Sequence, residues 1–182
     1  RNGRIDDSSY GGGPGMVLAV PPVRAAITSA KVDAGEDSHV MYMSPQGARF
    51  DQYAVKNLRD LEHIIILAGR YEGIDQRIRD MFIDTEISIG DYVLTGGELP
   101  ALILCDCIIR LIPGSMSNST CALSDSFQDN LLAPPTYTRP ANFRGKKVPS
   151  ILLSGNNHKI KEWKEAESYK KTREKRPELL DE

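Results

Sequence analysis

Three short polar segments, each placed after an apolar run, carry the residue types that bind a small polar ligand. Residues 44–47 (Ser-Pro-Gln-Gly) follow the apolar residues 40–43, and residues 69–75 follow the apolar residues 63–68. The third segment is residues 87–100, in which three glycines surround a β-prone run. Glycine lets a backbone turn and approach a ligand closely. In a parallel sheet such segments leave one edge, so we expect them to converge on one crevice.

Two bland explanations of these glycines stay open. Glycine and proline punctuate ordinary turns, which accounts for any one of the three segments taken alone. Residues 11–15 (Gly-Gly-Gly-Pro-Gly) form either a flexible surface turn or a loop that contacts substrate. They follow no strand-like run, and their proline lacks a backbone donor, so they are not a dinucleotide fingerprint. The chain also lacks the G-x-x-x-x-G-K-[ST] pattern, which excludes a P-loop NTPase.

Hydrophobic patterning predicts the elements that must position these loops. We expect an α/β layer with a parallel sheet in residues 1–116. The expected strands are residues 16–20, 40–43, 63–68 and 88–94, and the expected helices are residues 22–34, 48–61, 75–81 and 99–112. Residues 113–124 are rich in Ser, Asn, Thr and Gly, so we expect a mobile linker there, of which residues 117–124 separate the two domains. Residues 125–182 form a second, mostly helical domain in this prediction.

Composition limits the class of protein. A chain of 182 residues with 40% hydrophobic content fits one domain, or one domain plus a small appendage. No apolar run reaches the roughly 18 residues of a membrane span, so we expect a cytoplasmic protein without membrane contact. Cys105 and Cys107 point to different faces of the expected helix, and Cys121 leaves the cysteine number odd. With only three scattered histidines, we expect no structural metal.

The net charge of −2 hides an asymmetry along the chain. Residues 1–143 carry 12 Lys and Arg against 18 Asp and Glu, whereas residues 144–182 carry 11 against 7. Residues 157–176 are expected to form a helix with an apolar stripe of Ile160, Trp163, Ala166 and Tyr169 and a basic remainder. This pattern suits either a solvated amphipathic helix or a surface that contacts phosphates.

Nine ordered motifs connect the chain with a known family. They are Tyr-Gly-Gly-Gly-Pro-Gly-Met at 10–16, Ser-Pro-Gln-Gly at 44–47, Gly-Arg-Tyr-Glu-Gly-Ile-Asp at 69–75, the whole of 87–100, Arg-Leu-Ile-Pro-Gly at 110–114, Asp-Ser-Phe at 125–127, Tyr-Thr-Arg-Pro at 137–140, Leu-Leu-Ser-Gly at 152–155 and Arg-Pro-Glu-Leu-Leu at 176–180. On these motifs the chain, from about Ile5 to Glu182, resembles the bacterial tRNA (guanine-N1)-methyltransferases of the SPOUT class. The family's first strand and helix have no counterpart in this sequence.

This resemblance implies a fold, an activity and partners. The implied fold is an α/β SPOUT-type parallel sheet with a C-terminal trefoil knot, plus a small, mostly helical C-terminal domain. The implied reaction moves a methyl group from S-adenosyl-L-methionine to N1 of guanine 37, the nucleotide 3′ of the anticodon in tRNA. The implied assembly is a homodimer with active sites at the subunit interface. The implied RNA contact is the anticodon stem-loop.

The resemblance also assigns two catalytic residues. Asp125 matches the general base of the family, and Arg110 matches the residue that stabilises charge on the guanine. An ordinary aspartate has a pKa of about 3.9, so such a base acts by its position and in concert with methyl transfer. Two alternatives stay open, because Asp125 is also suited to cap a helix and Arg110 is spaced to pair with Asp106.

Binding residues carry over from the same motifs. The implied cofactor contacts are Tyr42, Ser44, Pro45, Gln46, Gly47, Gly69, Tyr71, Glu72, Ile89, Gly90, Asp91, Tyr92, Val93, Leu94, Gly96, Gly97 and Pro100. The expected RNA contacts are Gly15, Lys159, Lys164, Lys171 and Arg173.

One departure and two rival functions accompany these assignments. Residues 121–124 are Cys-Ala-Leu-Ser, whereas family members often carry acidic residues just before the catalytic aspartate. We therefore expect no metal site there. The rivals are a related SPOUT methyltransferase acting on another RNA, for which the basic segment after Asp125 is unexpected, and a non-catalytic RNA-binding protein.

Overall fold

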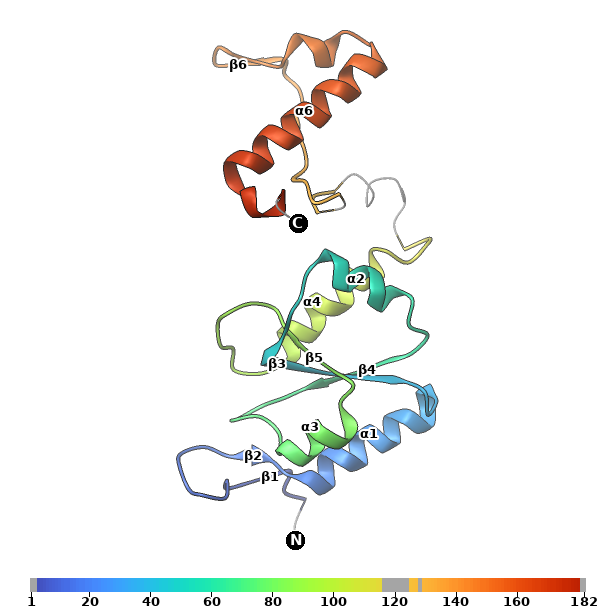
Figure 1. The fold of residues 1–182 in the computed structure, drawn as a ribbon, viewed down its shortest axis with the longest axis vertical. Coiled ribbons are helices and arrows are strands. Elements are labelled where there is room, and N and C mark those ends of the chain that lie inside the picture. Colours follow the sequence, from blue (N-terminus) through green and yellow to red (C-terminus); the bar gives the residue numbers. More distant parts are fainter. Residues whose placement is uncertain (1–2, 116–124, 128, 181–182) are drawn as a thin grey trace. The chain divides into compact units, whose positions relative to one another are not determined.

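A computed structural model describes residues 3–115, 125–127 and 129–180 of the chain. The chain divides into two compact units, Arg1–Met116 and Ser117–Glu182, which we describe separately (Figure 1). The linker predicted at residues 117–124 lies outside the described residues.

Unit 1 is built on a three-stranded parallel sheet. Strand β3 (His39–Arg49) lies between β4 (Ile64–Ala68) and β5 (Thr85–Ser88). Its residues 39–43 pair with β4 in continuous register. The pairing with β5 shifts in register between Met43 and Ala48, because residues 44–47 of β3 form an irregular stretch between its two paired parts. The predicted α/β class with a parallel sheet is confirmed.

Helices cover both faces of this sheet (Figure 1). Helices α1 (Val20–Ala34) and α3 (Gln76–Phe82) lie on one face, and α2 (Gln52–Arg59) and α4 (Glu98–Ile109) on the other. Successive side chains of β3 point to opposite faces of the sheet, so the hydrophobic core consists of two clusters, one on each face. Its residues Val40 and Tyr42 pack in one hydrophobic cluster with residues of α1 and α3, and Met41 and Met43 pack in a second cluster with residues of α2 and α4.

Local sequence explains where these helices begin and end. The Asp51 carboxylate accepts a hydrogen bond from the Ala54 N–H at 2.8 Å and caps α2, and Asp75 caps α3 in the same way. Helix α1 carries prolines in its first turn and ends at Gly35, whose φ of 103° suits glycine.

Four predicted bounds in unit 1 need correction. The strand expected at residues 88–94 ends at Ser88, because Gly90 takes a positive φ of 148° and turns the chain into a loop. Strand β2 is only Val17–Leu18 and pairs antiparallel with β1 (Asp6–Asp7). Residues 44–47 lie within β3, which continues to Arg49. The helix expected at 48–61 is therefore the shorter α2.

Unit 2 combines one long helix with a short hairpin. Helix α6 (Asn157–Lys175) is preceded by strands β6 (Asn142–Phe143) and β7 (Lys146–Lys147) and by the 3₁₀ helix η1 (Ser150–Leu153). A second 3₁₀ helix, η2 (Pro177–Leu179), follows it.

The inward face of α6 differs from the predicted stripe. Ile160 and Trp163 are half-buried as expected, but Ala166 and Tyr169 are exposed. Thr172 is fully buried instead: its hydroxyl donates to the Ser168 carbonyl at 2.7 Å and accepts from the Leu132 N–H at 2.9 Å. Hydrogen bonds of Thr172 therefore hold the inward face of α6, and hydrophobic periodicity does not reveal them.

Among the described residues, no helix has both the length and the apolar character needed to cross a membrane.

Candidate active site

Unit 1 contains a pocket of about 250 Å³ at the carboxyl ends of β4 and β5 and beside residues 42–46 of β3, where the pairing of β3 with β4 ends. Fifteen of the seventeen predicted cofactor residues line it: Tyr42, Ser44, Pro45, Gln46, Gly69, Tyr71, Glu72, Ile89, Gly90, Tyr92, Val93, Leu94, Gly96, Gly97 and Pro100. The three polar segments therefore converge as the sequence predicted. The topology explains this, since the loops after β4 and β5 leave the same edge of the sheet, and residues 44–46 of β3 lie just beyond its last pair with β4.

Two of the predicted residues do not line the pocket. Gly47 lies where β3 rejoins β5, and a Cβ there would collide with the backbone of Glu86 and Ile87. The absence of a side chain at Gly47 therefore permits the close pairing of β3 with β5. Asp91 lies in the loop after β5 and is exposed.

Eight further residues line the pocket that the prediction did not include: Met43, Arg70, Gly73, Ile74, Arg79, Ile87, Ser88 and Thr95. Most of them are neighbours of predicted residues within the same segments. Arg79 is different, because it reaches the pocket from α3. No sequence motif marks it.

Glycines bring the walls of the pocket close together. A Cβ on Gly69 would lie 2.9 Å from the Tyr42 ring, and a Cβ on Gly97 would lie 2.8 Å from both Ala68 Cα and Gly69 N. Tyr71 has a φ of 61°, a left-handed conformation that non-glycine residues seldom adopt. Such backbone strain gathers at ligand sites. The loops after β4 and β5 are therefore packed backbone to backbone, which leaves room only for glycine at these contacts.

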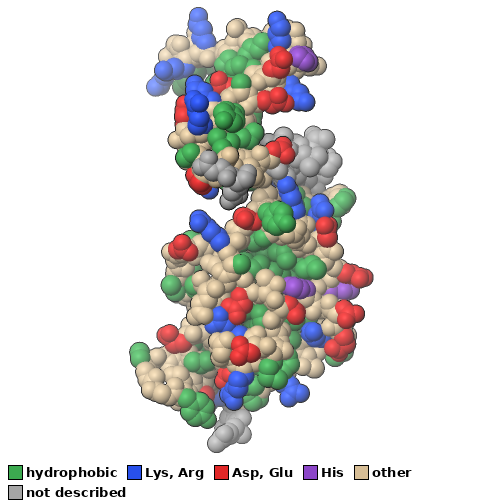
Figure 2. Space-filling view, viewed as in Figure 1, with side chains coloured by type: hydrophobic (Ala, Val, Ile, Leu, Met, Phe, Trp, Pro, Cys, Tyr) green, Lys and Arg blue, Asp and Glu red, His purple; other side chains and the backbone are tan. Residues whose placement is uncertain are grey.

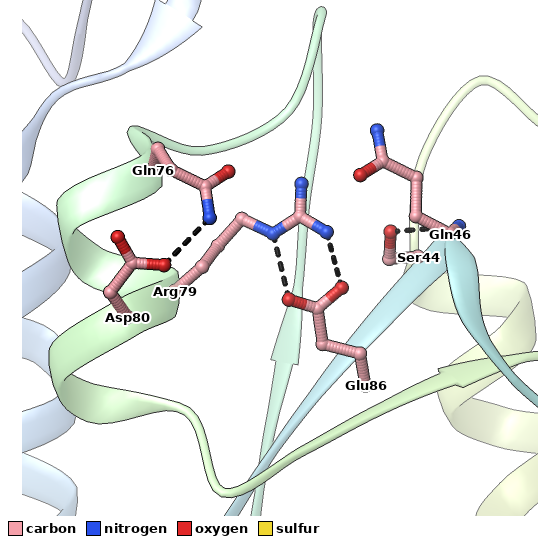
Figure 3. A network of polar contacts seen from close by, with 6 residues as sticks. All are labelled: Ser44, Gln46, Gln76, Arg79, Asp80 and Glu86. Atoms are coloured by element: carbon pink, nitrogen blue, oxygen red, sulfur yellow. Dashed lines mark hydrogen bonds and ion pairs between the residues drawn. The ribbon is translucent and has the colours of Figure 1, made fainter.

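An ion pair between α3 and β5 lies beside the pocket. Arg79 of α3 donates to both carboxylate oxygens of Glu86 on β5, with a distance of 2.7 Å from Nε to Oε1 (Figure 3). The two side chains are only 15% and 24% exposed. The hydrogen bonds that Arg79 donates to the Glu86 carboxylate raise the pKa of the Arg79 guanidinium, which therefore stays charged.

The Arg79 guanidinium also faces Tyr42. Its Cζ lies 5.8 Å from the centroid of the Tyr42 ring, within cation–π range. Burial raises the pKa of the Tyr42 phenol, which therefore stays protonated at neutral pH. The pair of Arg79 and Glu86 thus holds an aromatic wall of the pocket in place.

A second ion pair joins two loops at the rim. Arg70 Nε donates to Glu98 Oε1 at 2.7 Å, and both side chains are about half exposed. A backbone hydrogen bond within Glu98 and the Arg70 hydrogen bond lower the pKa of the Glu98 carboxyl. This pair links the loop after β4 to the first turn of α4.

The glycine-rich segment comes close to the pocket at one point. The Glu72 N–H donates to the Met16 carbonyl at 2.9 Å, and a Cβ on Gly15 would lie 2.6 Å from Glu72 Cγ. Gly15 has a φ of 90°. The predicted RNA contact Gly15 therefore lies beside the predicted cofactor contact Glu72.

The two predicted catalytic residues belong to different units. Arg110 is exposed directly after α4, and its N–H donates to the Asp106 carbonyl at 3.1 Å. Asp125 is exposed in unit 2, at the start of a turn in which the Phe127 N–H donates to the Leu131 carbonyl at 2.7 Å. Within the described residues 125–127 no helix begins, so helix capping by Asp125 has no support there.

The predicted RNA-contacting side chains of α6 differ in their surroundings. Lys159, Lys164 and Arg173 are exposed. Lys171 is half-buried, and its Nζ donates to the Ala133 carbonyl at 3.0 Å. The Lys171 charge is therefore engaged within unit 2.

A search of the described residues finds no group of three or more His, Cys, Asp or Glu side chains suited to a metal ion. What unit 1 offers is a glycine-lined cradle with backbone donors and acceptors, tyrosine side chains and fixed charges. Such a pocket suits a small ligand with a flat, polar-edged part.

Comparisons with known proteins agree on one family. The family described as "tRNA (Guanine-1)-methyltransferase TrmD" matches residues 1–182. A protein named tRNA (guanine-N(1)-)-methyltransferase from Christiangramia forsetii is 56% identical over 178 residues, which are 98% of this chain and 78% of that protein. Proteins with the same name from Flavobacterium psychrophilum and Bacteroides fragilis are 54% and 51% identical. These matches cover 97% and 98% of this chain, and 78% and 79% of the respective relatives.

Proposed function

Because the chain belongs to the tRNA (guanine-1)-methyltransferase family, we propose that it transfers a methyl group from S-adenosyl-L-methionine to N1 of guanine 37 in tRNA. The observation that carries this proposal is the convergence of fifteen predicted cofactor residues on one pocket of unit 1. The family resemblance implies seventeen cofactor contacts, and all of them except Tyr42 belong to three separate segments of the chain. Their meeting at one sheet edge is what a common ligand requires.

The pocket fits the proposed methyl donor in shape and chemistry. When bound, S-adenosylmethionine supplies a methyl group activated by a sulfonium charge. The cradle at Gly69 and Gly97 admits a flat group close to the backbone, where peptide N–H and C=O groups can read the edge of an adenine. The Glu72 carboxylate lines the pocket and favours a cationic ligand, whereas Arg70 and Arg79 in the same lining are paired with Glu98 and Glu86.

In this proposal the chemistry on guanine rests on Asp125 and Arg110. Methylation of N1 removes the N1 proton as the methyl group arrives, and negative charge then spreads toward O6. The Asp125 carboxylate takes that proton as general base, and the Arg110 guanidinium stabilises the charge on the guanine. The exposure of both side chains in their own units leaves them accessible to a substrate.

We further propose a homodimer in which Asp125 serves the pocket of the partner chain, and a trefoil knot formed by the segment that includes residues 87–100. Helix α4 supports the dimer, because Leu99, Leu102 and Ile103 are exposed at the i, i+3, i+4 spacing of one helix face. Exposed apolar surface of this kind marks interaction sites. Unit 2, with its basic α6, is proposed to bind the anticodon stem-loop.

Methyl transfer to defined transcripts tests the proposal. Tritiated S-adenosylmethionine is supplied with tRNA carrying guanine 37 or adenine 37, using the wild-type chain, Asp125→Ala and the control Asp129→Ala. Asp129 is a second exposed carboxylate of the same unit. We expect labelling of the guanine transcript only, a rate loss of about 10²- to 10⁴-fold in Asp125→Ala, and little change in Asp129→Ala.

Calorimetry with S-adenosylmethionine separates binding of the methyl donor from the methyl transfer itself. Asp125→Ala should bind the methyl donor as the wild type does. Equal labelling of both transcripts would point to another target nucleotide. Equal rates in the two variants would remove Asp125 from the mechanism, and absence of donor binding by the wild-type chain would refute the pocket assignment.

A further inference from the structure

Unit 2 has a pocket of its own, distinct from the site in unit 1. It encloses about 360 Å³ and lies between the segment before β6, the segment after β7 and η1. Its lining includes Tyr137 and Arg139 together with the apolar residues Val148, Leu152 and Leu153. Tyr137 is 49% exposed, so the pocket combines a solvent-accessible aromatic ring with apolar side chains.

The stretch of chain that forms this pocket is purely cationic. Residues 130–161 contain six Lys and Arg and no Asp or Glu. All of them are described residues, and the whole pocket lining falls within this stretch. Figure 2 shows Lys and Arg side chains gathered at the end of unit 2 that carries the β6–β7 hairpin. Such a surface attracts a polyanion.

The hairpin next to the pocket in the sequence carries a second aromatic ring and further cations. Phe143 and Lys146 are direct cross-strand partners, and the turn between them has positive φ at Arg144 and Gly145. Because side chains alternate along a strand, Lys146 shares the face of the pocket residue Val148, and Lys147 lies on the opposite face.

Stacking on the hairpin adds to this surface. The Arg144 Cζ lies 5.4 Å from the centroid of the Phe143 ring, and the ring is exposed. Exposed aromatic rings beside guanidinium and ammonium groups are the combination that proteins use to stack unpaired bases and hold their phosphates.

We propose that this pocket, here called the hairpin pocket, binds an unpaired nucleotide of the RNA substrate, with its base against Tyr137 and its phosphates beside Arg139 and Lys146. The proposal rests on the proposed RNA methyltransferase function and adds a second RNA-binding site to it. It assigns to this hairpin a role that the basic helix α6 alone does not supply, since stacking recognises an unpaired base and not only charge.

Binding of a tRNA transcript to the full chain, measured over a range of salt concentrations, tests the hairpin pocket. Tyr137→Leu removes the ring, Tyr137→Phe retains it, and Tyr53→Leu removes an exposed tyrosine of α2 in unit 1 as a control. We expect Tyr137→Leu to weaken binding by about five- to a hundredfold at every salt concentration. Tyr137→Phe and Tyr53→Leu should bind almost as the wild type does.

Two lysines of β7 give a matched test of the charge. Lys146→Gln should lower the slope of log affinity against log salt by about one, because one phosphate contact is lost. Lys147→Gln, on the other face of the hairpin, should change the slope much less. Thermal melting of each variant shows whether unit 2 remains folded.

The outcomes separate this proposal from the proposed function. If the wild-type chain methylates guanine and folded Tyr137→Leu binds tRNA with unchanged affinity, the hairpin pocket is refuted and the proposed function stands. Equal slopes for Lys146→Gln and Lys147→Gln would also refute it. If the wild-type chain binds no tRNA, both proposals fail together.

Discussion

The Gly97 N–H donates a hydrogen bond to the Gly69 carbonyl at 2.8 Å, which joins the loop after β5 to the loop after β4 across the pocket. The contact exists because neither residue has a side chain. A Cβ on Gly97 would lie 2.8 Å from Ala68 Cα and from Gly69 N, both of them backbone atoms that cannot move aside independently.

Gly97→Ala should therefore separate the two loops and open the pocket. We expect at least tenfold weaker binding of S-adenosylmethionine, measured by calorimetry, because contacts on both walls depend on this spacing. Gly35→Ala is the control: it has open space and a positive φ at the end of α1. It should cost about 1 kcal/mol of stability and leave donor affinity unchanged. Equal affinities for both variants would contradict the close-packing argument.

Glu86→Gln should destabilise unit 1. It leaves the Arg79 guanidinium, only 15% exposed, without its anionic partner. Breaking a fully buried pair costs about 3–5 kcal/mol, and the remaining water contact reduces this to about 1–3 kcal/mol. Denaturant unfolding measures it. Asp60→Asn, which removes the exposed partner of Arg59, should cost less than about 1 kcal/mol. An equal cost for both changes would mean that the Arg79 pair is as weak as a surface pair.

The sequence located the pocket better than it located the elements around it. Glycines after apolar runs predicted the loops, because close approach to a ligand leaves glycine as the only choice. The strand expected at 88–94 failed because the same β-prone residues, such as Tyr92 and Val93, here line a pocket instead of a sheet. The pairing of Arg79 with Glu86 joins a helix to a strand across a turn, and no periodicity encodes such a contact.

Asp75 makes stability depend on pH in acid. Its hydrogen bonds with the Arg77 side chain lower the pKa of the carboxyl from 3.8 to about 2 in the folded chain. The stabilisation is therefore present above the unfolded pKa and is lost as the pH falls through about 2.

Asp75→Ala should thus be less stable than the wild type at neutral pH, by about 1 kcal/mol through loss of the α3 cap. The difference in the free energy of unfolding should shrink between about pH 4 and pH 2, as protonation removes the same interaction from the wild type. Chemical denaturation across this range measures it. Asp33→Ala, an exposed carboxylate of α1, should show little difference at any pH. A pH-independent difference for Asp75→Ala would reject the ion pair as its cause.

Leu102→Glu should split the proposed homodimer. Leu102 is 64% exposed on α4, between Leu99 and Ile103. A carboxylate buried in an apolar interface has no partner, so association should weaken by several kcal/mol. Sedimentation of the variant should show monomers. As a control, Val32→Glu, which changes an exposed side chain of α1, should leave the oligomer intact. A wild-type chain that sediments as a monomer would refute the dimer itself.

Mixed dimers test whether Asp125 acts in the partner's site. Chains carrying Asp125→Ala and chains carrying Gly97→Ala are each expected to be inactive alone. Mixed, they should form one working site per heterodimer if Asp125 of one chain serves the pocket of the other, because that site combines an intact carboxylate with an intact cradle. Methyl transfer by the mixture should then approach a quarter of the wild-type rate at equal chain concentrations. If the mixture shows no methyl transfer although differential tags verify heterodimers, Asp125 and the glycine-lined pocket that it serves must belong to the same chain.

Lys171 and Lys164 should behave differently, although both were predicted to contact RNA. The Lys171 ammonium donates to the Ala133 carbonyl, so Lys171→Ala leaves a half-buried carbonyl without this donor. We expect it to lower the stability of unit 2 by about 1 kcal/mol. Lys164 is exposed, so Lys164→Ala should keep that stability and lower the salt dependence of tRNA binding by about one phosphate contact. A larger fall in salt dependence for Lys171→Ala than for Lys164→Ala would show that Lys171 leaves Ala133 to contact RNA.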